Sequence, residues 1–337
     1  MKKLAVLFLS LSLLLCACGE PAPEKAESFA CGTGERQCFA MSGDTLISAA
    51  VNEVRGFDLT GGKIFDIQTA IAHPAVCSNG SDAVICDVGG SAIVYGDGSV
   101  LDFENTIISA SLSDGGFLAV CAEEPGYKGA VTVYSPERSP VYKWYSAERQ
   151  TVCAAVSPDG EYLAVLCSGE NGGEIHIFSF DSEETQGVYS APEMLSEVFW
   201  LGDTICGVGG SGLYCCDAEG TDKGSYEFGK LVPGSFRVWG EKLVIELREH
   251  SFGGAGELVI INDRGSELGR ISPDGEILSL DCGDDGILCL SQSRITLYDT
   301  YYNEAFSADI TGAEAAFLRQ AGDILAVGGG NARVIEY

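Results

Sequence analysis

Residues 157–165 read Ser-Pro-Asp-Gly-Glu-Tyr-Leu-Ala-Val, which combines a tight turn with an apolar strand. Residues 111–120 repeat this arrangement as Ser-Leu-Ser-Asp-Gly-Gly-Phe-Leu-Ala-Val. Glycine, asparagine and aspartate tolerate positive φ angles and therefore permit the sharp reversal of a hairpin. The unit recurs roughly eight times at intervals of about 40 residues, and a fixed period of this length indicates a repeat architecture.

Each turn precedes a nearly continuous apolar segment, which predicts a strand buried on both faces. These segments cover residues 46–51, 83–86, 117–121, 162–167, 204–208, 242–245, 287–290 and 324–327. A third strand candidate follows each one, often ending in a bulky apolar residue before Asp or Asn, as in Phe57-Asp58 and Tyr298-Asp299. Four short strands per unit, without amphipathic helices between them, predict an all-β fold: a β-propeller of four-stranded blades.

The two ends of the repeat predict how the ring closes. The last unit stops after its third strand, at Tyr337, and residues 27–31 can supply the missing fourth strand. Such closure would remove the exposed edges of an open array. The count favours eight blades, with seven as the alternative, and the propeller domain covers residues 28–337. The segment Ser-Pro-Asp-Gly-Glu at 272–276 mimics the hairpin turn but falls in an expected inter-blade loop.

The N-terminus indicates an exported, lipid-anchored protein. Lys2 and Lys3 precede an apolar run over residues 4–15, which is typical of a secretory signal and too short for a membrane span. The run ends in Leu15-Cys16-Ala17-Cys18, which resembles the lipobox of bacterial lipoproteins. The resemblance implies a signal peptide over residues 1–17 and acylation of Cys18, including palmitate. Residues 18–27 form a tether, and the expected location is the extracytoplasmic side of the bacterial cell envelope.

Composition excludes several classes of partner. The formal net charge is −29, from 20 basic and 49 acidic residues. Nucleic acids and anionic lipid headgroups both require clustered Lys and Arg, so neither is an expected ligand; the membrane is reached through the lipid anchor alone. Most of the 14 cysteines lie inside apolar strand candidates, where they act as small hydrophobes. Cys31–Cys38 and Cys282–Cys289 are the pairs best placed to approach one another across neighbouring strands. No C-x-x-C spacing suggests zinc.

The repeat resembles WD40-like propellers of the TolB type, which carry a Ser-Pro-Asp-Gly-x-x-Leu-Ala motif. Residues 157–165 match that motif nearly in full, and weaker matches extend over residues 36–337. The Trp-Asp and Gly-His signatures of true WD40 repeats are absent, as are the boxes of sialidases and quinone-dependent dehydrogenases. The whole chain is similar to propeller lipoproteins of bacterial cell surfaces, which implies a fold and not an activity.

Catalytic motifs are missing from the sequence. His73, His176 and His250 fall in different units and are expected to be structural. No H-E-x-x-H, G-x-S-x-G or P-loop pattern occurs, so no metal, cofactor or enzymatic activity is predicted. The alternative is a hydrolase or lyase that acts in the propeller channel on cell-surface polysaccharide. It would need titratable groups that converge at the inner strand ends, where the sequence mostly offers Ala, Val, Cys and Ser.

Loop length indicates one candidate binding face. Loops after the second and fourth strands lie on the same face, and the second-to-third-strand loops at 123–129, 168–173 and 248–256 are expanded. The loop expected after the fourth strand of the third unit adds Trp144, Tyr145 and Arg149. Aromatic and arginine residues are favoured anchors of binding surfaces. The predicted face comprises Tyr127, Lys128, Trp144, Tyr145, Arg149, Asn171, Arg248, His250 and Phe252. The sequence thus predicts a monomeric, membrane-anchored binding or scaffold module for a protein or glycan partner.

Overall fold

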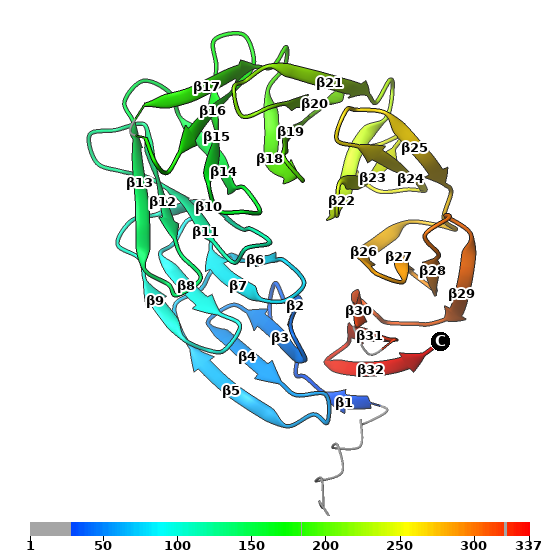
Figure 1. The fold of residues 1–337 in the computed structure, drawn as a ribbon. Helices are drawn as coiled ribbons and strands as arrows, with labels where there is room; N and C mark the ends of the chain where they lie inside the picture. Colours follow the sequence, from blue (N-terminus) through cyan, green and yellow to red (C-terminus); the bar gives the residue numbers. More distant parts are fainter. Residues whose placement is uncertain (1–27, 183, 320–321) are drawn as a thin grey trace, which may run out of the picture.

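The computed structural model describes residues 28–182, 184–319 and 322–337. In this part of the chain, 32 strands form eight antiparallel four-stranded sheets, arranged as blades around a common centre (Figure 1). The eight-bladed propeller is therefore confirmed, and the seven-bladed alternative is wrong. Among these residues no helix has the length and apolarity needed to cross a membrane. The signal peptide, Cys18 and the tether lie outside the described residues.

The first strand of each blade lies nearest the centre (Figure 1). These strands are β2 (Cys38–Ser42), β6 (Pro74–Ser78), β10 (Ile107–Leu112), β14 (Thr151–Val156), β18 (Leu195–Leu201), β22 (Val232–Trp239), β26 (Ile277–Gly283) and β30 (Ala315–Arg319). Small polar side chains link several of them to the next blade. Ser109 Oγ, for example, donates to the carbonyl oxygen of Val152 at 3.0 Å, joining β10 to β14.

The second strands are the most buried elements, as their continuous apolarity predicts. They are β3 (Thr45–Ala50), β7 (Ala83–Asp87), β11 (Leu118–Ala122), β15 (Tyr162–Ser168), β19 (Thr204–Gly209), β23 (Lys242–Arg248), β27 (Gly286–Ser291) and β31 (Asp323–Gly328). Every residue of β7, β11, β19 and β27 is buried. A second strand has a sheet neighbour on each side and an adjacent blade against each face, which leaves little room for water.

Third and fourth strands complete each blade outward. The third strands are β4 (Glu53–Phe57), β8 (Ala92–Tyr95), β12 (Gly129–Tyr134), β16 (Gly173–Ser179), β20 (Gly212–Cys216), β24 (Gly256–Asn262), β28 (Arg294–Tyr298) and β32 (Asn331–Glu336). The fourth strands are β5 (Lys63–Gln68), β9 (Val100–Asp102), β13 (Pro140–Ser146), β17 (Thr185–Ser190), β21 (Asp222–Glu227), β25 (Glu267–Ile271), β29 (Glu304–Asp309) and, for the last blade, β1 (Ser28–Ala30). Exposure alternates along β5 and β21, as expected for strands at the outer edge.

One serine and one glycine determine the shape of the turn at residues 157–165. Ser157 Oγ accepts hydrogen bonds from the backbone N–H groups of Glu161 and Tyr162, at 3.1 and 2.9 Å. Gly160 takes a φ of 76°, and a Cβ there would lie 2.3 Å from the Phe117 ring of the preceding blade. The turn thus needs glycine both for its backbone conformation and for contact between blades. The look-alike segment at 272–276 connects β25 to β26, an inter-blade loop as expected.

Eight separate apolar cores hold the ring together, one between each pair of adjacent blades. The core between blades 3 and 4, for example, joins Val131 of β12 to Leu163 of β15 and Phe178 of β16. Because each blade contacts only its two neighbours, stability is approximately a sum of intrinsic blade terms and junction terms.

The N-terminal strand closes the ring, as the sequence predicts. Strand β1 pairs antiparallel with β32, with Phe29 opposite Ala332. The chain then continues inward, and the N–H groups of Cys31 and Gly32 both donate to the carbonyl oxygen of Gly330, at 2.9 and 3.1 Å. Phe29 is buried and lies 6.4 Å from the Phe57 ring of blade 1, measured between centroids. The closing strand therefore packs on both blades that it joins.

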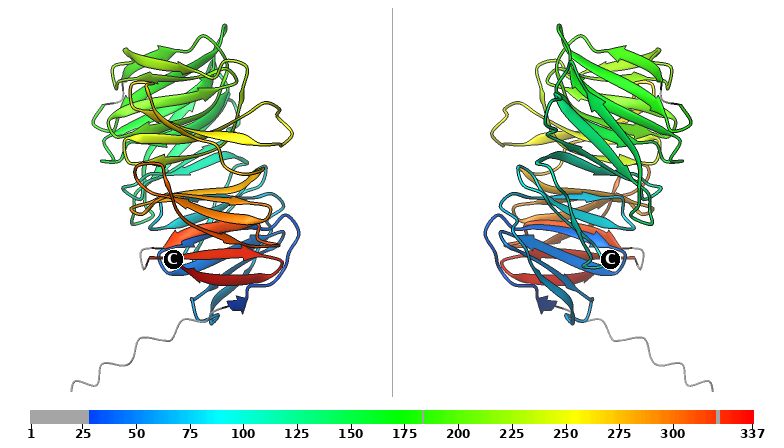
Figure 2. Two further views of the ribbon diagram at one scale, coloured as in Figure 1. Left: turned by 90° about the vertical axis from the view of Figure 1, so that its right-hand side faces the viewer. Right: turned by 90° about the vertical axis from the view of Figure 1, so that its left-hand side faces the viewer.

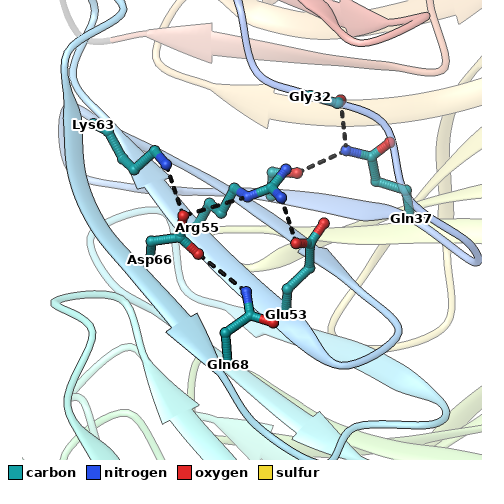
Figure 3. Close-up of polar contacts among 8 residues, drawn as sticks. Gly32, Gln37, Glu53, Arg55, Lys63, Asp66 and Gln68 are labelled. Atoms are coloured by element: carbon teal, nitrogen blue, oxygen red, sulfur yellow. Dashed lines mark hydrogen bonds and ion pairs between the residues drawn. The ribbon is translucent and has the colours of Figure 1, made fainter.

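Polar contacts reinforce this closure where the chain enters blade 1 (Figure 3). Gln37 Nε2 donates to the carbonyl oxygen of Gly32 at 3.1 Å and to Ser48 Oγ at 2.7 Å. Arg55 lies beside these residues and forms an ion pair with Glu53. The guanidinium of Arg55 packs so closely against Gly32 that a Cβ atom on Gly32 would lie only 2.5 Å from it. The segment after β1 is thereby tied to β3 and β4.

All 12 cysteines of the described residues are free thiols in the structure, including the two pairs that the sequence places best for bridges. Cys31 and Cys38 belong to the cores on opposite sides of blade 1. Cys282 faces Ile287 across the β26–β27 ladder, whereas Cys289 faces Leu280. Cys282 and Cys289 are therefore offset by two residues in the ladder. The prediction that the cysteines approach each other directly is wrong for Cys31–Cys38 and for Cys282–Cys289.

Candidate binding face

Loops after the second and fourth strands emerge on one face, because successive strands of a blade run in opposite directions. We call this side of the ring the candidate face. One of its two longest connections, between β23 and β24, projects from the body of the ring (yellow in Figure 2). The connection between β11 and β12 is also long.

Two tyrosines form an exposed aromatic pair at blade 3. The rings of Tyr127 and Tyr145 lie 4.8 Å apart, and the residues are 48 % and 41 % exposed. Lys143 Nζ lies 4.8 Å from the centroid of the Tyr145 ring and 3.2 Å from a carboxylate oxygen of Glu124. The pair offers a flat apolar contact beside one cation that is partly neutralised.

The structure corrects the placement of two predicted residues. Trp144 and Tyr145 lie within β13 and not in the loop after it. Because side chains alternate along a strand, the two residues point to opposite sides of the blade. Tyr145 contacts Tyr127, whereas Trp144 packs inward, 5.1 Å from Phe178 of blade 4.

Trp144 forms one wall of a shallow cavity of about 170 Å³ between blades 3 and 4. Arg149, Glu148 and His176 also line it. The Trp144 and His176 rings are 6.1 Å apart, so an aromatic surface lies beside the charged groups. A cavity of this size accommodates a single side chain or one small sugar-sized group.

Glu174 organises the charges of the cavity. Its carboxylate lies 2.9 Å from Arg149 Nε and 3.4 Å from His176 Nε2. Burial lowers the pKa of His176, because desolvation of the imidazolium outweighs the attraction of Glu174. His176 is therefore neutral at pH 7, and Arg149 is the cation that the cavity presents.

Lys128 and Asn171 are exposed members of the same region. Lys128 stands at the end of the loop before β12, and its backbone N–H donates to the carbonyl oxygen of Ser146 at 2.7 Å. Asn171 lies in the tight connection between β15 and β16, beside the carboxylate-bearing Glu170. Both flank the cavity without lining it.

The three remaining predicted residues belong to blade 6, and blade 5 separates them from blade 4. Phe252 is fully exposed and His250 is exposed, both in the connection between β23 and β24. Arg248 instead turns inward, with Nε 3.7 Å from the buried carboxylate of Glu246. The candidate face therefore consists of two patches, and only the one at blades 3 and 4 combines a cavity with aromatic and charged walls.

Sequence reasoning missed Glu148 and Glu174 and treated His176 as structural. A signal was present: Glu174 and His176 alternate along one strand, so they share a side of blade 4. What the sequence could not supply is the neighbour across the junction, since Trp144 and Arg149 come from blade 3 and the loop after it.

Two carboxylates lie on inner strands. Burial raises the pKa of Glu197 on β18. The negative charge of Glu197 in turn contributes to the raised pKa of Cys77 and of Cys153, which lie on other inner strands. Burial also raises the pKa of Asp281 on β26, which accepts a hydrogen bond from the Leu318 N–H of β30 at 2.8 Å. Asp281 thus has a structural role between blades 7 and 8. Across the described residues, no group of three or more His, Cys, Asp and Glu side chains could hold a metal ion.

A family model described as a family of unknown function, DUF5711, matches residues 26–323. The chain belongs to this family. A search of curated protein sequences finds no match.

Solved structures with a similar fold are propellers of low sequence identity. BamB from Moraxella catarrhalis is 13 % identical, with a TM-score of 0.55, over 93 % of this chain and 99 % of that chain. Sqt1 from Saccharomyces cerevisiae is 9 % identical, with a TM-score of 0.65, over 93 % of this chain and 98 % of that one. KlAtg21, solved in complex with the coiled coil of AgAtg16, is 13 % identical, with a TM-score of 0.52, over 69 % and 83 %. At such identities the likeness concerns the fold alone.

Proposed function

We propose that this chain is a non-enzymatic binding module that docks a partner protein on the patch at blades 3 and 4. The observation that carries the proposal is that the outer strand β13 bears an exposed Tyr127–Tyr145 pair on one side and the cavity walled by Trp144 and Arg149 on the other. Tyrosine, tryptophan and arginine are the residues that most often supply binding energy at protein interfaces. The two tyrosine rings, tilted by 34° to each other, also restrict one another before binding, so docking a partner would cost less side-chain entropy.

Charge indicates what kind of partner fits. Glu123 is exposed and Glu148 and Glu170 line the shallow depressions beside the aromatic residues, on a chain with a formal net charge of −29. Complementarity then favours a segment that carries Lys or Arg, with the aliphatic stems resting on the tyrosine rings. A glycan partner would use the same aromatic surface but would not depend on charge.

The orientation of the closing strand fits a tethered module. Strand β1 runs from Ser28 toward the candidate face, because it pairs antiparallel with β32, which leads away from that face. Ser28, the point at which a tether would join the propeller, thus lies on the face opposite the patch. We propose that the anchor is an acylated Cys18 on the extracytoplasmic side of the cell envelope.

Related folds support the general idea by analogy. KlAtg21, a propeller, has been solved in complex with a coiled coil from AgAtg16. A ring of blades presents rigid loop-bearing faces, which suits it to hold partners without performing chemistry.

Site-specific photocrosslinking in cells tests the docking patch. A photoreactive phenylalanine at Tyr145 of the full chain should give a discrete protein adduct. The matched control is the same group at Tyr301, which is 82 % exposed in a turn on the opposite face. The adduct should weaken in a Tyr127→Ala, Glu148→Gln background, which removes one ring of the pair and one of the attracting carboxylates, and it should also weaken at high ionic strength. Equal adducts at both positions, or none at Tyr145, would reject the patch, and a salt-insensitive glycan adduct would replace the protein partner by a sugar.

The anchor has a separate test. Mass spectrometry of the mature N-terminus should find an acylated Cys18, and Cys18→Ser should release the chain into the soluble fraction. An unmodified N-terminus on a freely secreted chain contradicts the anchor and leaves the docking patch untouched.

A further inference from the structure

Two cysteines face each other directly across a hairpin of blade 5. Cys206 of β19 is the register partner of Cys215 of β20. Flanking partners are Ile205 with Cys216 and Gly207 with Tyr214, so the ladder is regular around the pair. Neither predicted cysteine pair has this arrangement.

The hydrogen-bond pattern places the pair at a close-approach position. The Ser211 carbonyl oxygen accepts from the Phe228 N–H at 2.8 Å, and the Asp217 N–H donates to the Thr221 carbonyl oxygen at 3.0 Å. Backbone groups alternate in direction along a strand, so Cys215 also directs its N–H and C=O toward β21. Cys206 and Cys215 therefore form a non-hydrogen-bonded pair, in which Cα atoms lie about 4.5 Å apart and side chains are closest.

That spacing falls within the range that a disulfide bridges, about 4.4–6.8 Å between Cα atoms. Both thiols also lie on the same side of the blade, in the core shared with Leu243 and Ile245 of blade 6. The thiols interact: burial raises the pKa of Cys206, and a hydrogen bond with Cys215 raises it further. The adjacent Cys216 points to the other side, into the core shared with blade 4.

A second pair of interacting thiols shows that strand register decides whether two neighbouring cysteines can form a disulfide. Cys77 and Cys86 also hydrogen-bond, but Cys77 faces Val84 and Cys86 faces Ala75. Such a diagonal relation separates Cα atoms by about 7–8 Å, which exceeds the disulfide range. The two pairs therefore have different covalent chemistry despite similar thiol contact.

We propose that Cys206 and Cys215 form a cross-strand disulfide when the chain folds in an oxidising environment. The oxidant is another disulfide, of the glutathione class. The thiolate of one cysteine attacks one sulfur of the oxidant, which breaks the S–S bond of the oxidant, forms a mixed disulfide with that sulfur and releases the other half as a thiol. The second thiolate then displaces the other thiol, so that one disulfide and two protein thiols become one protein disulfide and two small thiols.

Burial sets the timing of the reaction. Both cysteines are fully buried, at 0 % exposure, so an oxidant reaches them during folding and not afterwards. The bond would fasten the β19–β20 hairpin at its junction with blade 6, where the rings of Phe199 and Phe236 lie between the inner strands β18 and β22.

Thiol mapping of the full chain tests the proposal. The chain is unfolded under reducing conditions, refolded with reduced and oxidised glutathione, and alkylated after denaturation. Chymotryptic cleavage after Tyr214 separates Cys206 from Cys215 unless a disulfide joins them. We expect a linked pair of fragments with the alkyl group on Cys216, and a melting temperature about 5 °C above that of the chain refolded with reductant.

Matched variants identify the atoms involved. Cys216→Ser should keep the linked fragments, whereas Cys215→Ser should abolish them, and Cys77 and Cys86 should be alkylated throughout. Alkylation of both Cys206 and Cys215 in the refolded wild type would overturn the proposal, as would a link from Cys206 to any other cysteine. If refolding fails, the same thiol mapping is applied to chain isolated from an oxidising compartment, with free thiols alkylated at lysis. A link between Cys206 and Cys215 there supports the proposal, and alkylation of both overturns it.

Discussion

The junction between blades 3 and 4 and the junction between blades 5 and 6 join equivalent strands in different ways. At the first, small residues let the inner strands approach, and Ser111 Oγ donates to the Ala154 carbonyl oxygen at 2.6 Å. At the second, Phe199 of β18 and Phe236 of β22 face each other with ring centroids 5.2 Å apart. Figure 1 shows the wider spacing between the β18 and β22 ribbons.

The difference shows that the repeat constrains blades more strongly than junctions. Within a blade, backbone hydrogen bonds fix the distance between strands whatever the side chains. Between blades, side-chain volume decides the distance, so serine permits direct links and phenylalanine prevents them. Blades 5 and 6 compensate at the outer edge, where Arg270 of β25 donates to the Tyr226 hydroxyl oxygen of β21 at 2.9 Å.

Removing the aromatic spacer should have the largest effect on this contrast. Phe199→Ala leaves a void in the junction between blades 5 and 6 and should lower the free energy of unfolding by about 2–3 kcal/mol. Urea denaturation measures the loss. Tyr301→Ala, at a solvent-exposed ring, is the control and should change stability by less than about 0.5 kcal/mol. A Phe199→Ala variant as stable as this control would show that the rings do not support the junction.

Removing a serine link should cost less. Ser111→Ala deletes the donor to Ala154 and should lower the free energy of unfolding by about 1 kcal/mol. Ser235→Ala, at an exposed serine of the inner strand β22, should have no measurable effect. Equal losses for the two variants would contradict the contrast between the junctions.

A pH experiment extends the comparison of junctions to the side of blade 6 that faces blade 7, where Glu246 is buried. Burial raises the pKa of Glu246 above its ordinary value of 4.5, so the folded state holds this proton more tightly than the unfolded state. The resulting stabilisation is present at low pH and is lost as the pH rises through the raised pKa. Glu246→Gln should remove this loss, so at pH 7 the free energy of unfolding of the variant should exceed that of the wild type by on the order of 1 kcal/mol. Chemical denaturation between pH 4 and 7 measures it, and the exposed Glu241→Gln should leave the wild-type profile unchanged.

The outer clasp should have the smallest effect. Arg270→Gln breaks contacts with Tyr226, Glu257 and Glu267, all of them at the surface. The expected loss is about 0.2–1 kcal/mol, and it should fade at high salt, because exposed ion pairs are screened. A larger, salt-independent loss would mean that the clasp and not the aromatic spacer holds blades 5 and 6 together.

Much of the fold could be predicted because its determinants are local. Gly160 needs positive φ and Ser157 caps the turn within a few residues, so the hairpins are visible in the sequence. The candidate site was less predictable, since its parts come from different blades. Trp144 was assigned to a loop, and the cavity depends on Glu174 and His176 of blade 4, which the sequence did not connect to it.

By itself the sequence determined the repeat, the eight buried second strands and the N-terminal strand that closes the ring, because strand periodicity and turn chemistry act over a few residues. Only the tertiary structure decided the contacts between blades. Register placed Cys206 opposite Cys215 while it offset Cys282 from Cys289. Curvature of the ring separated Phe252 from Tyr145 and brought Trp144 to His176. These outcomes depend on side-chain volume and strand register across distances that no local pattern encodes.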